Sequence, residues 1–328
     1  MRGAIGVWRW LSYAIVAAVW ICPATSWAQN FPSKPVRYVI PFNAGSSPDV
    51  VGRILAERLT RLWGQQVVVE NRVGAAGTLG SAFVAKAPPD GYTLLQANIA
   101  TNAISVSLYA KLPYDQLRDF APITRIGMTP NIITVHPSVP FKSIKQFIAY
   151  AKAHPGQLSY SAALVGTSPQ LSMELLKLQA KFDIVHIPYR NAAQGLSDTI
   201  GGQIPVNISN LPATIGPVQT GRVRALAVTS AQRISQMPDV PTMQESGVPG
   251  FEVNSWYGVA AAAGTPAPLL DKLNADITAV LRMPEVQQRL IELVIPPSPT
   301  SREEFDQFIR AEIARWAQVI KDAGIPQQ

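Results

Sequence analysis

The chain has 328 residues, a single cysteine and a formal net charge of +7 at pH 7. This length suffices for two lobes with separate hydrophobic cores, and one cysteine excludes a disulfide framework. Lys and Arg are scattered, without a basic run or interleaved aromatic residues, which argues against nucleic-acid binding, while the modest positive surplus suits the attraction of small anions.

Residues 1–28 have the pattern of a cleaved secretory signal. Two arginines precede an apolar stretch at 10–21, and Ser26-Trp27-Ala28 offers small residues for a cut after Ala28. The stretch is too short to span a membrane. Because Ile21, not a small residue, precedes Cys22, we expect a protein that is free in an extracytoplasmic compartment and has no lipid anchor.

Strands and helices alternate in the first part of the mature chain. Residues 36–40 predict a strand, and residues 48–63 predict a helix that Gly64 ends. A strand at 66–70, a helix at 78–87 and a strand at 92–95 are expected next. This alternation indicates a mostly parallel sheet with helices on both faces.

The rest of the chain continues in the same way. Strands are expected at 131–135, 158–161, 184–187, 206–209 and 223–228, and helices at 143–153, 169–179 and 192–200. Ser143 is the expected N-cap of the first of these helices. An apolar stretch at 256–263 precedes two long helices, at 266–281 and 301–323, and the second opens with a capping box of Ser301 and Glu304.

The chain is expected to cross twice between two α/β lobes, near residues 127–130 and 252–255. One lobe would consist of residues 29–128 plus 253–328, and the other of residues 129–252. Two crossings allow the lobes to bend about a hinge. Ligands of open α/β sheets lie outside the carboxyl ends of the strands, so we expect a ligand cleft between the lobes.

Two short segments of the chain read almost alike. They are Gly45-Ser46-Ser47-Pro48-Asp49 and Gly166-Thr167-Ser168-Pro169-Gln170. Each follows an apolar run and opens a helix, because Ser before Pro is a strong helix start. Each also offers N–H groups, hydroxyls and a positive helix end, which together can hold an anion. For either one alone an ordinary capped helix start is the favoured interpretation, whereas two facing loops would form a cleft.

Catalytic and metal-binding patterns are not evident. His136, His154 and His186 are not spaced with another histidine or a carboxylate as a metal motif requires, so we interpret them as structural or surface residues. A G-x-S-x-G nucleophile elbow is missing, although a Ser–His–Asp triad can assemble in space without a sequence signature. We expect a binding protein without metal or cofactor rather than an enzyme.

Nine short motifs occur in order along the mature chain. They are Phe31-Pro-Ser-Lys-Pro-Val36, Val69-Glu-Asn-Arg72, Pro89-Asp-Gly-Tyr-Thr-Leu-Leu95, Leu112-Pro-Tyr114, Arg118-Asp-Phe120, Ile187-Pro-Tyr189, Arg224-Ala-Leu-Ala-Val-Thr229, Pro238-Asp-Val-Pro-Thr242 and Ala263-Gly-Thr-Pro266. Together they resemble the Bug-type periplasmic substrate-binding proteins of tripartite tricarboxylate transporters, over residues 31–325. The resemblance implies a type II-like, Venus-flytrap periplasmic binding protein, whose two α/β lobes close on a small organic anion such as a dicarboxylate or an aromatic carboxylate.

The resemblance also implies where the ligand lies. In the family, the loop after the first strand and the hydroxyl loop of the second lobe hold a ligand carboxylate through backbone groups, hydroxyls and bridging waters. The segment after the third strand and the region around Tyr189 also line the cleft. The expected ligand-binding residues are Phe42, Asn43, Ala44, Gly45, Ser46, Ser47, Asp49, Asn98, Ala100, Thr101, Ser161, Ala162, Gly166, Thr167, Ser168, Tyr189 and Asn191.

The chain departs from the family pattern in two loops. The usual Pro-Phe-Pro-Pro-Gly-Gly reads Pro41-Phe42-Asn43-Ala44-Gly45-Ser46, and the usual Pro-Tyr-Lys-Gly reads Pro188-Tyr189-Arg190-Asn191. Asn43 and Asn191 either contact the far end of a ligand or face solvent in turns. Ser46, where the family usually keeps glycine, is expected to influence ligand choice.

Several individual roles stay open. Ser46, Ser47, Thr167 and Ser168 are expected to grip one carboxylate, although Ser47 and Ser168 could instead only cap their helices. Asp49 gains from the helix dipole but would repel an anion, so it caps the loop or meets an amino group of the ligand.

The aromatic residues near the cleft also allow two interpretations. Phe42, Tyr189 and Trp256 would form an apolar wall or stack on an aromatic acid, and core packing is favoured for Trp256. The expected partners are the small anion and a membrane permease, with the chain itself a monomer. A ligand sensor for a two-component system is the alternative, and a hydrolase on the same scaffold is a third.

Overall fold

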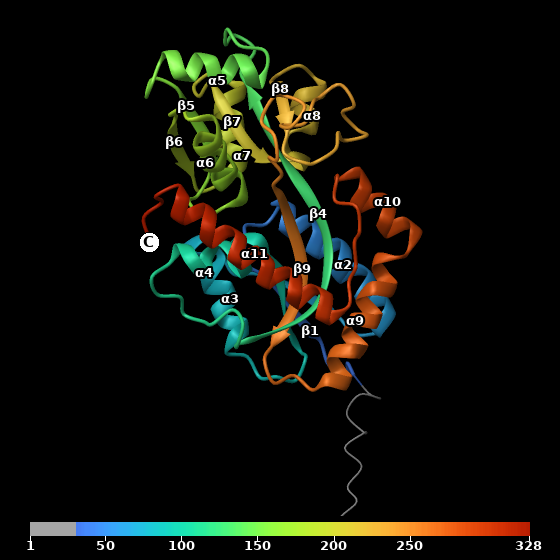
Figure 1. The fold of residues 1–328 in the computed structure, drawn as a ribbon. Coiled ribbons are helices and arrows are strands. Elements are labelled where there is room, and N and C mark those ends of the chain that lie inside the picture. Colours follow the sequence, from blue (N-terminus) through green and yellow to red (C-terminus); the bar gives the residue numbers. More distant parts are fainter. Residues whose placement is uncertain (1–30) are drawn as a thin grey trace, which may run out of the picture.

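A computed structural model describes residues 31–328, so the predicted signal at 1–28 lies outside the described residues. Nine strands join in one continuous sheet with the order β2-β1-β3-β9-β4-β7-β5-β6, and β8 pairs with β4. Figure 1 shows two groups of helices, one around each half of this sheet. The mixed α/β architecture agrees with the fold class predicted from the sequence. No helix in this part of the chain combines the length and apolarity that crossing a membrane requires.

The first half of the sheet is built around β1 (Val36–Ile40). This strand pairs in parallel with β2 (Val67–Asn71) and β3 (Thr93–Asn98), and β3 pairs antiparallel with β9 (Asn254–Ala262). Helices α2 (Ser47–Trp63), α9 (Ala267–Leu281) and α10 (Pro284–Glu292) contribute to one apolar cluster, and helices α3 (Thr78–Ala85), α4 (Ser105–Leu108) and α11 (Arg302–Asp322) contribute to another. Short turns η2 (Ala75–Gly77) and η3 (Ala100–Ile104) precede α3 and α4.

The second half of the sheet repeats the strand–helix alternation. In it, β5 (Ser159–Ala163) pairs in parallel with β6 (Val185–Tyr189) and β7 (Val206–Asn210), and β8 (Arg224–Val228) lies antiparallel to β4 (Phe120–Val135). The accompanying helices are α5 (Ile144–Ala153), α6 (Ser168–Ala180), α7 (Ala192–Ile200) and α8 (Ile215–Gln219), with the short turn η4 (Leu211–Ala213) between β7 and α8.

Two antiparallel strands join the halves. The 16-residue β4 pairs with β9 along its first part and with β7 and β8 along its second. The predicted crossings at 127–130 and 252–255 fall in this pair, where Thr129 lies opposite Ser255 and Pro130 opposite Asn254. The division into lobes at these residues stays a prediction. The strand itself begins eleven residues earlier than position 131, where we expected it.

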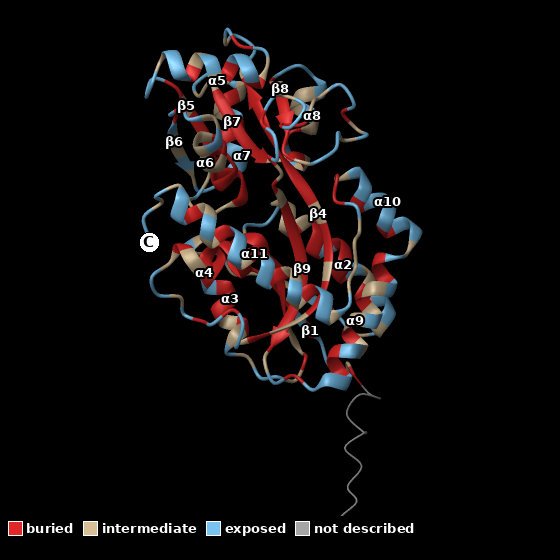
Figure 2. Ribbon diagram, viewed as in Figure 1, coloured by how far each residue is buried: buried red, intermediate tan, exposed pale blue. Residues whose placement is uncertain are grey.

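Buried residues run along the sheet in both halves of the molecule, and exposed residues lie mainly on the helices and loops around it (Figure 2). Trp256 is fully buried, packs edge-on against Phe305 and Phe308, and donates its indole N–H to Glu312. Trp256 is therefore a core residue and not part of a cleft wall, as favoured from the sequence.

Local helix signals in the sequence were mostly reliable. Gly64 ends α2 with a positive φ of 63°, Ser143 caps α5, and Ser301 with Glu304 forms the predicted capping box of α11. The prediction missed α10, although Pro284 begins it. A proline at the first helical position is itself a start signal.

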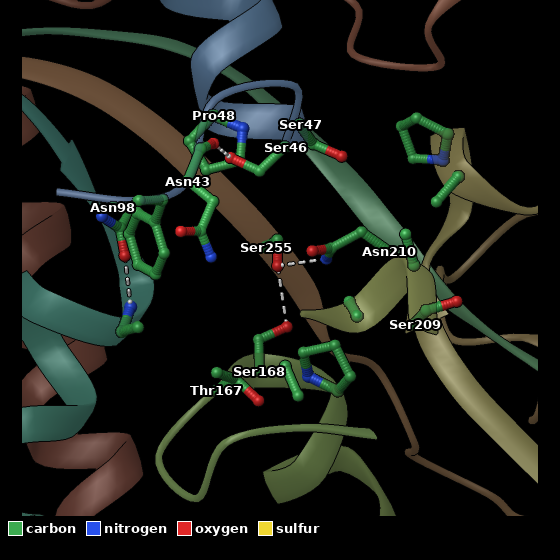
Figure 3. Close-up of a pocket in the computed structure, with 18 of the residues that line it drawn as sticks. Asn43, Ser46, Ser47, Pro48, Asn98, Thr167, Ser168, Ser209, Asn210 and Ser255 are labelled. Atoms are coloured by element: carbon green, nitrogen blue, oxygen red, sulfur yellow. Dashed lines mark hydrogen bonds between the residues drawn. The ribbon is translucent and has the colours of Figure 1, made fainter. Parts of the chain in front are cut away.

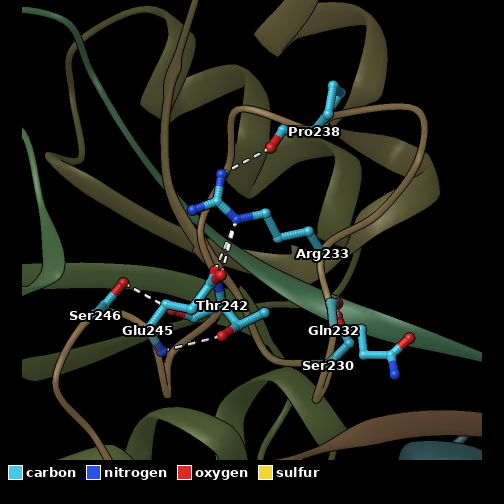
Figure 4. A network of polar contacts seen from close by, with 7 residues as sticks. All are labelled: Ser230, Gln232, Arg233, Pro238, Thr242, Glu245 and Ser246. Carbon is cyan, nitrogen blue, oxygen red and sulfur yellow. Dashed lines mark hydrogen bonds and ion pairs between the residues drawn. The ribbon is translucent and has the colours of Figure 1, made fainter.

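The long connection between β8 and β9 has no helix or regular strand and is held by polar contacts (Figure 4). Arg233 donates its Nε hydrogen to both carboxylate oxygens of Glu245, at 2.8 and 3.1 Å, and its Nη1 to the Pro238 carbonyl. Glu245 also accepts the Thr242 N–H at 2.8 Å. Thr242 in turn forms a parallel bridge with Val228 at the end of β8, which ties the connection to the sheet.

Candidate functional site

A cleft of about 410 Å³ lies where the two halves of the sheet meet. Of the predicted ligand-binding residues, those that line it are Phe42, Asn43, Ala44, Gly45, Ser46, Ser47, Asn98, Ala100, Thr167, Ser168 and Asn191. Figure 3 shows the loop with Ser46 and Ser47 on one side, the loop with Thr167 and Ser168 on the other, and Ser255 between them. The structure thus brings both hydroxyl loops to one cleft.

The two loops share the same backbone geometry. Gly45 and Gly166 adopt positive φ angles of 77° and 88°, which glycine tolerates without the steric cost of a side chain. The Gly45 N–H donates to Asp49 at 2.8 Å, and the Gly166 N–H donates to Gln170 at 3.2 Å. In both loops, a glycine amide is therefore held by a side chain four residues later, in the first turn of the helix.

The capping role that we considered for Ser47 and Ser168 is not seen, because both are the first helical residues and the N-cap positions belong to Ser46 and Thr167. Ser46 precedes α2 and Thr167 precedes α6, and neither side chain accepts a helix N–H. The Ser46 hydroxyl donates to the Asn43 carbonyl at 2.6 Å, and the Thr167 hydroxyl donates to the Leu164 carbonyl at 2.9 Å. The hydroxyls close the loops instead, and first-turn N–H groups keep their capacity to bind an acceptor.

A polar network connects the second loop to the base of the cleft. Ser168 and Ser255 share a hydrogen bond of 2.8 Å, and the Asn210 amide donates to Ser255 at 2.7 Å. The Asn131 amide donates to Ser168 and Ser172, both at 2.8 Å. Ser168 is thereby fixed by contacts with β4 and β9 rather than by its own helix.

Local sequence patterns do not identify Ser255, Ser209 or Asn210 as site residues, although all three line the cleft. Ser209 and Asn210 are the last two residues of β7, and Ser255 is the second residue of β9. Asn210 and Ser255 have hydrogen-bond partners that lie 45 to 87 residues away in the chain. Only the pairing of β9 and β7 with β4 brings them to the loops.

Asp49 does not line the cleft. Its carboxylate is buried and accepts hydrogen bonds from the Gly45 N–H, from Arg53 at 2.9 Å and from Asn71 at 2.8 Å. Burial raises the pKa of Asp49, but these hydrogen bonds and the charge of Arg53 outweigh burial and hold the pKa below its usual value. The carboxylate stays ionised inside the first loop and is fully engaged there.

The other predicted residues outside the cleft lining are Thr101, Ser161, Ala162, Gly166 and Tyr189. Ser161 is fully buried and bonds the Gly195 carbonyl, and Thr101 donates to Asn102 at 2.7 Å. The Tyr189 hydroxyl donates to Asp198 at 2.6 Å, and this hydrogen bond raises the pKa of Tyr189 to about 12.

Ala162 and Gly166 lie behind the cleft surface. Ala162 is buried within β5 opposite Pro188 of β6. Gly166 packs against Leu108, so closely that a Cβ at position 166 would lie 2.5 Å from a Leu108 methyl.

Asn98 lines the cleft, but its side chain is occupied by the turn that follows. Its Oδ1 accepts the N–H groups of Ala100 and Thr101, at 2.9 and 3.2 Å, and its amide donates to the Thr101 hydroxyl. The role of this side chain is to fix the start of η3, which lies at the cleft with Ala100.

Arg190 carries the only charge among the described residues that line the cleft. It directly follows β6, and its side chain is exposed. Most of the remaining surface is apolar and includes Phe42, Ile208 and Ile295. The cleft therefore combines helix N-termini, neutral polar groups and one cation, which suits an anion with an apolar body.

Tyr257 on β9 also lines the cleft, and its hydroxyl has no hydrogen-bond partner among residues 31–328. Burial raises the pKa of Tyr257 well above its usual value. The nearby Ser47 hydroxyl opposes this rise in pKa in part, although the two hydroxyls do not have the geometry of a hydrogen bond. As for metals, residues 31–328 contain no group of three His, Cys, Asp or Glu side chains able to hold an ion.

Comparisons with known proteins agree on one family. The family model described as the tripartite tricarboxylate transporter family receptor matches residues 51–325. Protein BugT of Bordetella pertussis is 35% identical over 298 residues, covering 90% of this chain and 91% of BugT.

Two solved structures resemble the chain over most of its length. An R. palustris protein solved with adipate is 36% identical with a TM-score of 0.86, covering 90% of this chain and 99% of that one. MatC from Rhodopseudomonas palustris, solved with bound malate, is 31% identical with a TM-score of 0.82, covering 88% of this chain and 100% of MatC.

Proposed function

The chain belongs to the tripartite tricarboxylate transporter receptor family, and from this premise we propose that it captures a small organic carboxylate in the cleft. The family is one of periplasmic solute-binding receptors and not of enzymes. In this proposal, the mature protein works in the periplasm as a monomer and delivers its ligand to a membrane permease.

One observation carries the proposal: two loops of the same geometry open toward one cleft, each at a helix N-terminus. A helix N-terminus attracts negative charge and offers unsatisfied N–H groups. The Ser47 and Thr167 side chains add hydroxyls beside them. The related proteins solved with adipate and malate support a carboxylate as the ligand.

The energy required is within reach of such groups. A hydrogen bond to a charged group contributes about 1.5–3 kcal/mol, and micromolar affinity needs about 8 kcal/mol net. Four or five such bonds from N–H groups and hydroxyls of the two loops suffice, once the cost of fixing the ligand is subtracted. We therefore assign a carboxylate group of the ligand to the space between Ser46–Ser47 and Thr167–Ser168. Asn43 and Asn191 would lie nearer the other end of the ligand.

The test is calorimetric titration of the mature protein with malate, adipate and benzoate. The double variant Ser46→Ala with Ser168→Ala is expected to bind at least tenfold more weakly. The matched control is Ser197→Ala with Thr220→Ala, because both side chains are exposed, neither residue lines the cleft, and each hydroxyl donates to the carbonyl four residues earlier. Unchanged affinity of the double variant would remove these two hydroxyls from the site.

A thermal-shift experiment provides the second readout. A ligand that binds only the folded state stabilises it by about 2.7 kcal/mol at a hundredfold excess over Kd. The ligand recovered after incubation should be chemically unchanged. Turnover of any bound carboxylate would contradict a pure receptor, and no stabilisation by any carboxylate would contradict the proposed ligand class.

A further inference from the structure

Arg190 stands out because its charge has no partner within the described chain. Its guanidinium takes part in none of the ion pairs or hydrogen bonds of residues 31–328, although the neighbouring side chains are engaged. Tyr189 before it bonds Asp198, and Asn191 after it accepts the Ala193 N–H at 3.0 Å. The residues around Arg190 are thus anchored, while its own side chain is left at the cleft with all donors unused.

The sheet order places Arg190 away from the polar network at the base of the cleft. Asn210 ends β7, and Arg190 follows β6, with β5 lying between these two parallel strands. Neighbouring strands are about 4.8 Å apart, so the two strand ends are separated by about 10 Å. Asn210 bonds Ser255 and belongs to the loop side of the cleft. The loop with Thr167 and Ser168 follows β5, whose last residue, Ala163, lies opposite Tyr189. Arg190 therefore flanks this loop on the side away from Ser255, which marks the loop end of the cleft.

The charge balance of the cleft differs between these two ends. The loop end has hydroxyls, amides and helix N-termini but no full positive charge among its described lining residues. Those groups can hold one carboxylate. A second carboxylate at the other end would lose its hydration and needs a positive charge in exchange. Arg190 offers that charge, and its planar guanidinium can donate two parallel hydrogen bonds to the carboxylate.

We propose that Arg190 is the residue that makes the cleft select dianions over monoanions, by binding the second carboxylate of a ligand that spans the cleft. This rests on the proposed function, since it assumes a first carboxylate at the two loops. Arg190 is a specificity-determining residue and contributes little to a ligand that carries one charge.

The experiment compares diacids with monoacids of the same length by calorimetry. The pairs are adipate with hexanoate, glutarate with pentanoate, and terephthalate with 4-methylbenzoate. The proteins are the unmodified chain, Arg190→Gln, Arg190→Lys and the charge-matched control Arg222→Gln. Arg222 is exposed and lies outside the cleft, so the control lowers the net charge equally without touching the site.

The expected result is a change in selectivity. Arg190→Gln should weaken the best-bound diacid at least tenfold and leave its monoacid partner within twofold. Arg190→Lys should have a diacid affinity between those of the unmodified chain and Arg190→Gln, because an ammonium keeps the charge but cannot donate two parallel hydrogen bonds from one planar group. Arg222→Gln should bind all compounds as the unmodified chain does.

Three outcomes count against the proposal. Equal losses for diacid and monoacid would mean that Arg190 acts on the fold or the loop. An unchanged diacid affinity would remove it from the site. Both results would leave carboxylate capture intact, whereas failure of the unmodified chain to bind any of the six compounds would reject the proposed function and this inference with it.

Discussion

Replacing Tyr257 by phenylalanine removes a single buried atom that has no hydrogen-bond partner within residues 31–328. The side chain is 3% exposed, so the ring remains buried after the change. A buried hydroxyl without a partner costs about 1–3 kcal/mol relative to a satisfied one. We therefore expect Tyr257→Phe to stabilise the folded protein by about 1 kcal/mol, which is opposite to the usual effect of a core substitution.

The assay is urea unfolding of the mature protein, supported by thermal denaturation. A gain of about 1 kcal/mol corresponds to a rise in Tm of about 2 °C for a chain of this size. The matched control is Tyr38→Phe, because the Tyr38 side chain is equally buried but its hydroxyl donates to Gln96. That variant should lose about 1 kcal/mol, since the Gln96 oxygen is left without its donor. The hydroxyl of Tyr257 is covered, so carboxylate affinity should stay within twofold.

A lower midpoint for Tyr257→Phe, comparable with that of Tyr38→Phe, would refute the reasoning. It would mean that the Tyr257 hydroxyl has a partner in solution, either an ordered water or a rotated Ser47 hydroxyl. A weaker affinity with unchanged stability would be a different failure, because it would place the hydroxyl in contact with the ligand.

Three further outcomes are expected. Asp49→Asn should lower the stability of the protein at neutral pH and make that stability less dependent on pH. Because the pKa of Asp49 is held low, the carboxylate stabilises the fold above the usual carboxyl range, and this stabilisation is lost as pH falls through the lowered pKa. Acid unfolding of both proteins checks this expectation. Gly166→Ala should lower both stability and carboxylate affinity, since position 166 has a positive φ and a Cβ there would lie 2.5 Å from Leu108; normal calorimetry would show that the loop adapts. Asn210→Ala removes the donor that holds Ser255 at 2.7 Å and should cost about 1 kcal/mol in urea unfolding, with equal midpoints contradicting a structural role.

The sequence was informative wherever a signal is local. Gly64 and the capping box of Ser301 and Glu304 act within one helical turn, and the structure has both as expected. The two hydroxyl loops are predictable because a strand, a glycine and a Ser-Pro pair follow one another within a few residues. What the sequence could not supply is the register of β9 on β4, which brings Ser255 to Ser168 across 87 residues.

The hydroxyls at the two N-cap positions bond carbonyls instead of helix N–H groups for a physical reason. A Ser or Thr hydroxyl can bond a helix N–H or a nearby carbonyl, and both are short-range choices. In both loops the turn at Gly45 or Gly166 brings the carbonyl three residues earlier within 2.9 Å of the hydroxyl. The residue type at the N-cap position does not distinguish a bond to a helix N–H from a bond to a carbonyl. The glycine that precedes it, with its positive φ, is a feature that could distinguish them.

The pairing of β4 with β9 restricts how the molecule can deform. Hydrogen-bonded strands resist sliding, because any slip breaks the ladder between them. The two halves of the sheet are thus joined by a strand pair that resists sliding. Bending and twisting are the motions that keep its hydrogen bonds. Ser255 lies on this strand pair opposite Thr129 and also faces the cleft. One pair of spectroscopic labels, placed on either side of that strand pair, would therefore test whether the two halves of the sheet move relative to one another when a carboxylate binds.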